Sequence, residues 1–274
     1  MGRNRSADES RGPLKCRFGE RLSARIAARW MALAALTCCH TGSKAALTKE
    51  AANVETIEQA AGFGYECAWL AVRSTAPSDV IARLGIGKVR RTPWREGIDA
   101  AYSRHEHGAV YVTPPIDGWV LVAGTSLFAA VADQARRQHA TVGDGRVAQA
   151  LFAAEISSSL ATVVQYFLTY DFSGSQTWIL ADRGKLVRAY GVEESKVLFD
   201  KGERTPAENE LGIRFDLEAA APPFAKANPR AFAEWMSHEI DAEMVMRVAA
   251  RWSVDPRKLQ ERRLPQGWVG TYRP

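Results

Sequence analysis

The sequence lacks the short motifs by which common nucleotide-binding, hydrolytic and zinc enzymes are recognised. No GxxxxGK[ST] loop, no GxGxxG after an apolar strand, no GxSxG turn, no HExxH and no CxxC occurs among the 274 residues. These absences lower the expectation of an enzyme, and no cofactor is predicted. Apolar runs are also short, because none reaches the roughly 20 residues that a membrane-spanning helix requires.

Cysteine is scarce, which argues against a disulfide framework. Three of the four cysteines, Cys16, Cys38 and Cys39, lie near the N-terminus, and only Cys67 falls in the part of the chain expected to fold. Cys67 stands in a β-prone apolar run, where a small thiol packs well. We expect it to be a core residue.

The composition is that of a folded protein whose charge is unevenly distributed. Hydrophobic residues make up 46% and charged residues 24%, which supplies a core and excludes global disorder. The net charge of +5 arises mainly from basic groups at residues 3–29 and 251–263. Charge at two ends indicates solvated tails or a leader rather than a nucleic-acid-binding surface.

Residues 1–64 are predicted to be an N-terminal extension with a linker, and residues 65–274 a single domain. Arg21, Arg25 and Arg29 precede the apolar run 30–36, as in a secretory leader. The following residues up to Cys39 resemble a lipoprotein cleavage box, although such boxes prefer a small residue where Cys38 stands.

A solvated basic tail explains the extension equally simply, so both interpretations stay open. The sequence favours a cytoplasmic protein. The alternative is an exported envelope protein, attached to the membrane only by a lipid anchor at Cys39.

The expected domain alternates β-rich and helical stretches. A hairpin is predicted from 109–113 and 119–124 around the turn 114–118, and turns at 173–175 and 182–184 predict a meander. Further strands are expected at 65–74, 162–171, 176–181, 185–190 and 196–199. Helices are expected at 79–84, 95–104, 126–138, 147–161 and 229–252. An irregular loop is expected at 200–215.

Hairpins and meanders imply antiparallel pairing. The predicted fold is therefore an α+β two-layer sandwich, in which helices pack on a mainly antiparallel sheet of about six strands. Trp69 and Trp178 are expected to face the core, and the C-terminal helix should dock on the sheet through an apolar stripe that includes Met244 and Val248.

Three groups of residues are candidate sites. His105 and His107 lie one residue apart beside Glu106, so both imidazoles of an extended segment could share a metal ion, although a polar loop after a helix explains them as well. His238 and Asp241 share a helix face and could act as an acid-base pair, or they could be the solvated side of that helix.

The third group is a binding cleft. Trp94 and Trp119 adjoin turn residues and are expected to line an edge or cleft rather than the core, together with Arg95, Glu96 and Asp117. These residues predict where a binding site lies, but they do not identify its ligand.

Three segments resemble an uncharacterised family of bacterial proteins, over roughly residues 65–259. They are CAWLAVRS at 67–74, VTPPIDGW at 112–119 and AARWSVDP at 249–256. The resemblance implies a bacterial source and an ordered domain, and it assigns no catalytic residue.

Three functions remain as hypotheses. The first is a non-catalytic binding or accessory protein that acts through a protein partner, of the immunity or envelope-associated kind. The second is a metal-assisted hydrolase using His105 and His107. The third, which the charge distribution disfavours, is single-stranded nucleic-acid binding through exposed tryptophans.

Overall fold

The computed structural model describes residues 56–103, 108–128, 148–194, 196–216, 229–231 and 239–273. The chain divides into two units, Met1–Glu50 and Ala51–Pro274, and all of the described residues belong to the second.

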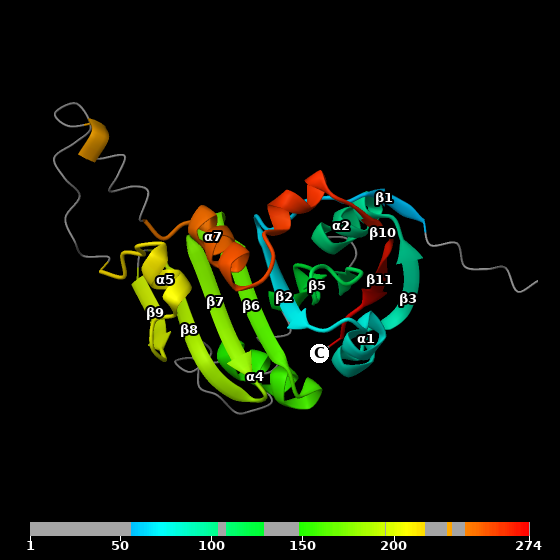
Figure 1. The fold of residues 1–274 in the computed structure, drawn as a ribbon, viewed down its shortest axis with the longest axis horizontal. Helices are drawn as coiled ribbons and strands as arrows, with labels where there is room; N and C mark the ends of the chain where they lie inside the picture. Colours follow the sequence, from blue (N-terminus) through cyan, green and yellow to red (C-terminus); the bar gives the residue numbers. More distant parts are fainter. Residues whose placement is uncertain are drawn as a thin grey trace, which may run out of the picture. The chain divides into compact units, whose positions relative to one another are not determined.

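Nine strands form one sheet in the order β3-β11-β4-β5-β2-β6-β7-β8-β9, and all neighbours in it pair antiparallel (Figure 1). This confirms the α+β class with a mainly antiparallel sheet. The strands are β2 (Cys67–Arg73), β3 (Gly87–Thr92), β4 (Ala109–Val112), β5 (Trp119–Ala123), β6 (Val163–Tyr170), β7 (Ser175–Asp182), β8 (Lys185–Glu193), β9 (Lys196–Lys201) and β11 (Gly267–Thr271).

A second, two-stranded sheet joins β1 (Ile57–Gln59) to β10 (Arg263–Pro265). β1 lies in the segment that the sequence assigns to the linker, and it pairs antiparallel with residues more than two hundred positions later. The chain on the N-terminal side of residue 65 therefore takes part in the fold from Ile57 onward.

Helices cover both faces of the large sheet. One apolar cluster contains residues of α2 (Trp94–Tyr102), α7 (Ala242–Trp252) and the 3-10 helix η2 (Pro256–Glu261), and the other contains residues of α1 (Pro77–Leu84) and α4 (Ala148–Leu160). Along β2, Trp69 and Ala71 belong to the first cluster, whereas Leu70 and Val72 belong to the second. Alternation along a central strand thus supplies both cores.

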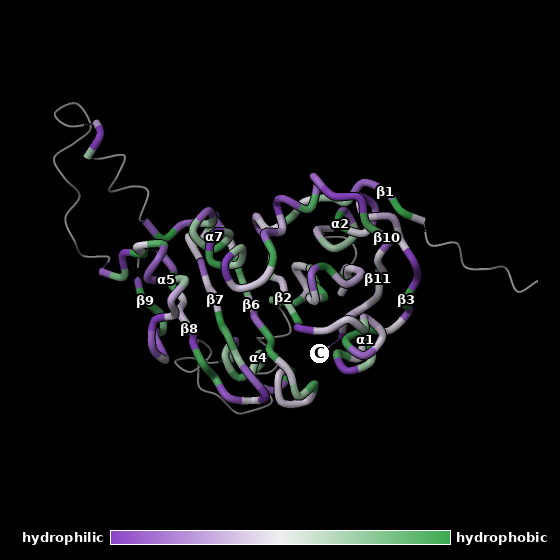
Figure 2. The backbone as a smooth tube through the Cα atoms, in the orientation of Figure 1, coloured by the Kyte–Doolittle hydropathy of each residue, from purple (hydrophilic) through white to green (hydrophobic). Residues whose placement is uncertain are grey.

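The sheet exceeds the expected six strands because β3 and β11 have no apolar signature. Five of the six residues of β3 are exposed, and Figure 2 shows this strand in hydrophilic colours. β11 contains Gly267 and Gly270, and a Cβ at either position would collide with neighbouring atoms. Strands of this composition are not recognised by apolar alternation.

The predicted C-terminal helix is not continuous. Glu239, Ile240 and Asp241 are outside any helix, and α7 begins after Asp241, whose carboxylate accepts the backbone N–H of Met244 at 2.8 Å. Asp241 is therefore a helix N-cap, which gives its side chain a role other than the expected acid-base pair. His238 lies outside the described residues.

The predicted orientation of two tryptophans is confirmed, since Trp69 and Trp178 are fully buried. Trp69 stacks on Phe167 with ring centroids 5.0 Å apart, and Trp178 stacks on Tyr190 at 4.8 Å. Met244 and Val248 of the expected apolar stripe are also buried.

A fully buried ion pair fixes the segment after β9 to the sheet. Arg188 Nε on β8 and the indole N–H of Trp178 each donate to Glu208 Oε1 at 2.8 Å. Glu208 lies on the short helix α5 (Pro206–Glu210), inside the predicted irregular loop, and its other carboxylate oxygen accepts the backbone N–H of Thr205 at 2.7 Å. Asp200 also pairs with Arg188.

We expect Glu208→Ala to lower the free energy of unfolding by about 3 to 5 kcal/mol, because it leaves the Arg188 charge buried beside only one carboxylate. The measurement is urea unfolding followed by tryptophan fluorescence. The control is Glu210→Ala on the same helix, whose exposed pair with Arg251 should contribute less than about 1 kcal/mol. Equal effects of the two substitutions would contradict a structural role for the buried pair.

Candidate functional site

Two of the sequence-predicted sites fall outside the described residues. His105 and His107 lie in the segment 104–107, and Cys39 lies in the first unit of the chain. Among the residues that are described, no three His, Cys, Asp or Glu side chains gather closely enough to hold a metal ion. Metal binding by His105 and His107, and lipidation of Cys39, stay predictions.

The predicted binding cleft is not assembled, because its tryptophans belong to the core. Trp94 is fully buried at the start of α2, and its indole N–H donates to the carbonyl of Pro265 at 2.8 Å. Trp119 is half-buried and packs against the same apolar cluster. Leu264 of β10 and Leu259 of η2 belong to the same cluster, and the sequence alone did not indicate these contacts.

The polar members of that predicted cleft lie apart. Arg95 and Glu96 are exposed on α2 beside a shallow pocket, where Glu96 pairs with Arg90 at 2.8 Å. Asp117 stands in the hairpin turn and accepts two hydrogen bonds from Arg262, at 2.6 and 3.1 Å. These bonds hold the pKa of the Asp117 carboxyl below its usual value.

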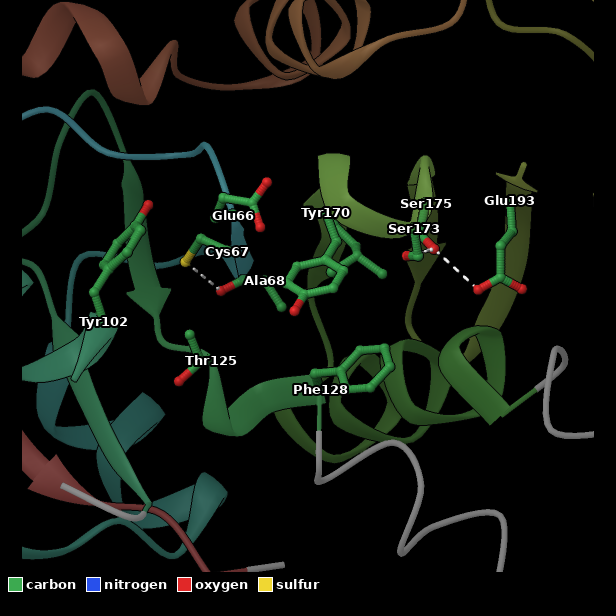
Figure 3. A pocket seen from close by; sticks show the side chains of 11 residues that line it. Glu66, Cys67, Ala68, Tyr102, Thr125, Phe128, Tyr170, Ser173, Ser175 and Glu193 are labelled. Carbon is green, nitrogen blue, oxygen red and sulfur yellow. Dashed lines mark hydrogen bonds between the residues drawn. The ribbon is translucent and has the colours of Figure 1, made fainter. Parts of the chain in front are cut away.

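A different pocket, of about 440 Å³, opens where β2 begins and β6 ends (Figure 3). Cys67 stands opposite Thr169 in the β2–β6 ladder, so Glu66 and Tyr170, the next residues outward, come together at its end. β7 and β8 extend the wall. The lining residues are Glu66, Cys67, Ala68, Tyr102, Thr125, Phe128, Leu168, Tyr170, Ser173, Ser175 and Glu193.

Among the described residues that line this pocket, the charged ones are both acidic. They are Glu66 and Glu193, and Asp171 lies beside the pocket between two lining residues. Glu66 Oε1 accepts the backbone N–H of Asp171 at 2.9 Å. Burial, and then the nearby charge of Glu66, raise the pKa of Asp171. Three neighbouring carboxylates contribute a negative potential at this end of the β2–β6 ladder.

A hydroxyl pair extends the polar wall from Glu193. Ser175 Oγ donates to Glu193 Oε1 at 3.1 Å, and Ser173 Oγ lies 2.6 Å from Ser175 Oγ. Gly174, between the two serines, has a φ of 57°, and this left-handed turn brings both hydroxyls to the same side. Glu193 is thus held in position while its second oxygen is not engaged by these hydroxyls.

Aromatic rings stand exposed at the same place. Phe172 is 91% exposed, Phe128 55% and Tyr170 37%, and the rings of Tyr170 and Phe172 meet edge to face at 6.4 Å. Figure 3 shows Phe128 below Tyr170 on the pocket wall. Phe172 belongs to the 3-10 helix η1 (Asp171–Ser173), which connects β6 to β7. An almost fully exposed phenyl ring in a tight connection contributes nothing to the core.

Cys67 is at the floor of the pocket but is not a nucleophile. Its thiol donates to the carbonyl of Ala68 at 3.1 Å, and burial raises the pKa of Cys67 to about 12. Burial also raises the pKa of the neighbouring Tyr102, whose hydroxyl accepts the backbone N–H of Gly64 at 2.9 Å. Both groups stay protonated near neutral pH, so the floor is uncharged.

The arrangement is suited to a ligand that combines a positive charge with an apolar part. Carboxylates and hydroxyls supply acceptors for N–H donors, and the aromatic faces attract a cation. Sequence reasoning did not identify these residues. The available signal was the string Tyr170-Asp171-Phe172, because bulky aromatic residues are uncommon in so tight a connection between strands.

Comparisons of the chain with protein-family models, with curated proteins and with solved structures found no match. Among the described helices, none has the length and apolar character needed to cross a membrane. The function is therefore argued from the pocket itself.

The raised pKa of Cys67 predicts slow alkylation of the native protein. With Cys16, Cys38 and Cys39 replaced by serine, iodoacetamide at mildly alkaline pH should modify Cys67 about a thousandfold more slowly than in urea, since the thiolate fraction falls tenfold for each unit between 9.0 and about 12. Mass spectrometry measures the rate. A native rate close to the unfolded one would contradict a buried thiol.

Proposed function

We propose that the chain is a non-catalytic binding protein which acts through a protein partner. In this proposal the pocket between Glu66 and Glu193 receives a basic side chain of the partner. The observation that supports it is that the charged side chains among the described lining residues are carboxylates, and that exposed aromatic rings lie at the same place.

Arginine and lysine side chains are suited to the carboxylates of this pocket. A guanidinium or ammonium group entering the pocket would meet Glu66 and Glu193, and both carboxylates are acceptors for charge-assisted hydrogen bonds. The pocket volume of about 440 Å³ is sufficient for such a side chain. Aliphatic parts of the same side chain would contact Leu168 and Ala68.

Exposed aromatic rings lie at the edge of the pocket. Phe172 at 91% exposure and Phe128 at 55% present apolar area that the isolated chain leaves in water. Exposed aromatic residues that gather at a pocket are typical of binding hot spots, where they are buried on association. A partner with a basic residue flanked by apolar residues would cover the rings as the charge enters the pocket.

The other hypotheses have less support from the described residues. Phosphate groups would be repelled by three neighbouring carboxylates, and Trp94, one of the tryptophans proposed to stack on bases, is buried. The hydrolase hypothesis depends on His105 and His107, which are outside the described residues. An immunity-type or envelope-associated role, in the cytoplasm or anchored through Cys39, is the finer form of the same proposal.

Immobilised short peptides test the pocket, with one central position varied among arginine, lysine, glutamate and glutamine between leucines. The full chain should retain the arginine and lysine peptides and not the glutamate peptide. Glu66→Gln combined with Glu193→Gln should weaken this binding about tenfold or more, and Phe172→Ala should have a similar effect. Surface plasmon resonance measures the affinities.

The matched controls are Glu203→Gln and Val197→Ala, which change an exposed carboxylate and an exposed apolar residue elsewhere. They should bind the basic peptides as the unmodified chain does. Equal retention of basic and acidic peptides, or no retention of any peptide, would overturn the proposal.

Binding should also weaken on acidification, starting at a higher pH than ordinary aspartate would give. The pKa of Asp171 is raised, so this carboxyl loses its charge at a higher pH than an ordinary aspartate does, and a cationic ligand then loses one attractive partner. Asp171→Asn should bind the arginine peptide more weakly at neutral pH and should lack the upper part of the pH dependence. An identical pH profile for both proteins would exclude Asp171 from binding.

A further inference from the structure

β3 forms one end of the nine-stranded sheet. In the part of the chain that the structure describes, its backbone pairs with β11 alone, and Figure 1 shows it at the outer margin of the sheet. Residues 87–91 are all exposed, and only Thr92 is buried. An edge strand presents backbone N–H and C=O groups that can pair with a further strand.

This edge is strongly basic on both of its faces. Lys88, Arg90 and Arg91 all lie on this strand, and Arg90 and Arg91 point to opposite sides of it because side chains alternate along its regular part. The Arg91 guanidinium lies over the Trp268 ring at 4.1 Å, and Arg90 pairs with Glu96 although both side chains stay about half exposed. Apart from Gly87 and Val89, every residue of the strand is polar or basic.

We infer that β3 binds an acidic, extended segment of a protein by strand addition. The segment pairs antiparallel or parallel with the free edge of β3, and its carboxylates meet Lys88, Arg90 and Arg91. Main-chain hydrogen bonds supply affinity in this mode of recognition, and side chains at alternate positions supply specificity. This inference does not depend on the pocket.

The basic charge of β3 favours an acidic strand beside it over a second copy of β3. A second copy of β3 would place like charges directly opposite each other, which destabilises a strand pair. β9, at the other end of the sheet, has Lys196 and Lys201 against Asp200, and the first thirty residues of the chain are themselves basic. An acidic segment is the complement of the edge. Single-stranded nucleic acid would match the charge but has no amide groups for the ladder.

The geometry of β3 limits the length of the added strand. Lys88 has a φ of 51°, and the register with β11 shifts between Val269 and Thr271. Pro93 follows the strand and cannot donate a backbone hydrogen bond. The stretch in regular register with β11 is therefore Arg90–Thr92, enough for a short peptide whose acidic side chains reach both faces.

The experiment uses a fluorescein-labelled peptide of alternating glutamate and valine, measured by fluorescence anisotropy with the full chain. We expect binding that weakens with salt, together with slower hydrogen exchange of the β3 amides. Lys88→Glu combined with Arg90→Glu should lower the affinity about tenfold or more and should bind the matching lysine–valine peptide instead. Circular dichroism confirms that the variant is folded.

Two controls separate strand addition from charge attraction. The double substitution Lys196→Glu and Lys201→Glu, at the opposite edge, should leave the affinity unchanged. An acidic peptide with proline at alternate positions should not bind, since proline removes backbone donors. The inference is overturned if the proline peptide binds equally well, if oligothymidine binds and the peptide does not, or if the glutamate–valine peptide does not bind.

Discussion

Six residue pairs, from Cys67 opposite Thr169 to Val72 opposite Val164, join β2 to β6 at the centre of the sheet. Every residue of β2 except Arg73 is buried, and the strand supplies both apolar clusters. A shift by one residue would exchange the faces of all these side chains, so the register is strongly determined. The same register places Glu66 beside Asp171, and the pocket exists only because this ladder ends there.

The described surface separates its charges between two places. Carboxylates gather at the pocket beside exposed aromatic rings, whereas cations occupy the free edge at β3. The carboxylates of the pocket find few basic partners nearby, in contrast to the Arg188–Glu208 pair, which is neutralised inside the protein. The buried charges of Arg188 and Glu208 are thus paired with each other, whereas the charges at the pocket and at β3 lie where a partner could reach them.

The sequence predicted the elements whose side chains face a core. An apolar, β-prone run identified β2, and turn residues identified the hairpin and the meander to which β6 belongs. β3 has exposed charges and β11 contains two glycines, so neither shows such an apolar run. The pocket could not be predicted, because Glu66, Tyr102, Thr125 and Glu193 are far apart in the sequence and meet only through strand pairing. The turn residues beside Trp94 predict a position at a cleft, whereas the structure buries this side chain, and its indole N–H donates to Pro265 near the C-terminus.

The most direct test of the central claim is a nuclear magnetic resonance titration of the chain with a short peptide that has arginine between leucines. We expect saturable chemical-shift changes of the backbone amides of Glu66, Asp171 and Glu193, while the chemical shifts of the β3 amides stay unchanged. Shifts confined to other parts of the fold, or no shifts at saturating peptide, would contradict a cation-binding pocket at the end of the β2–β6 ladder.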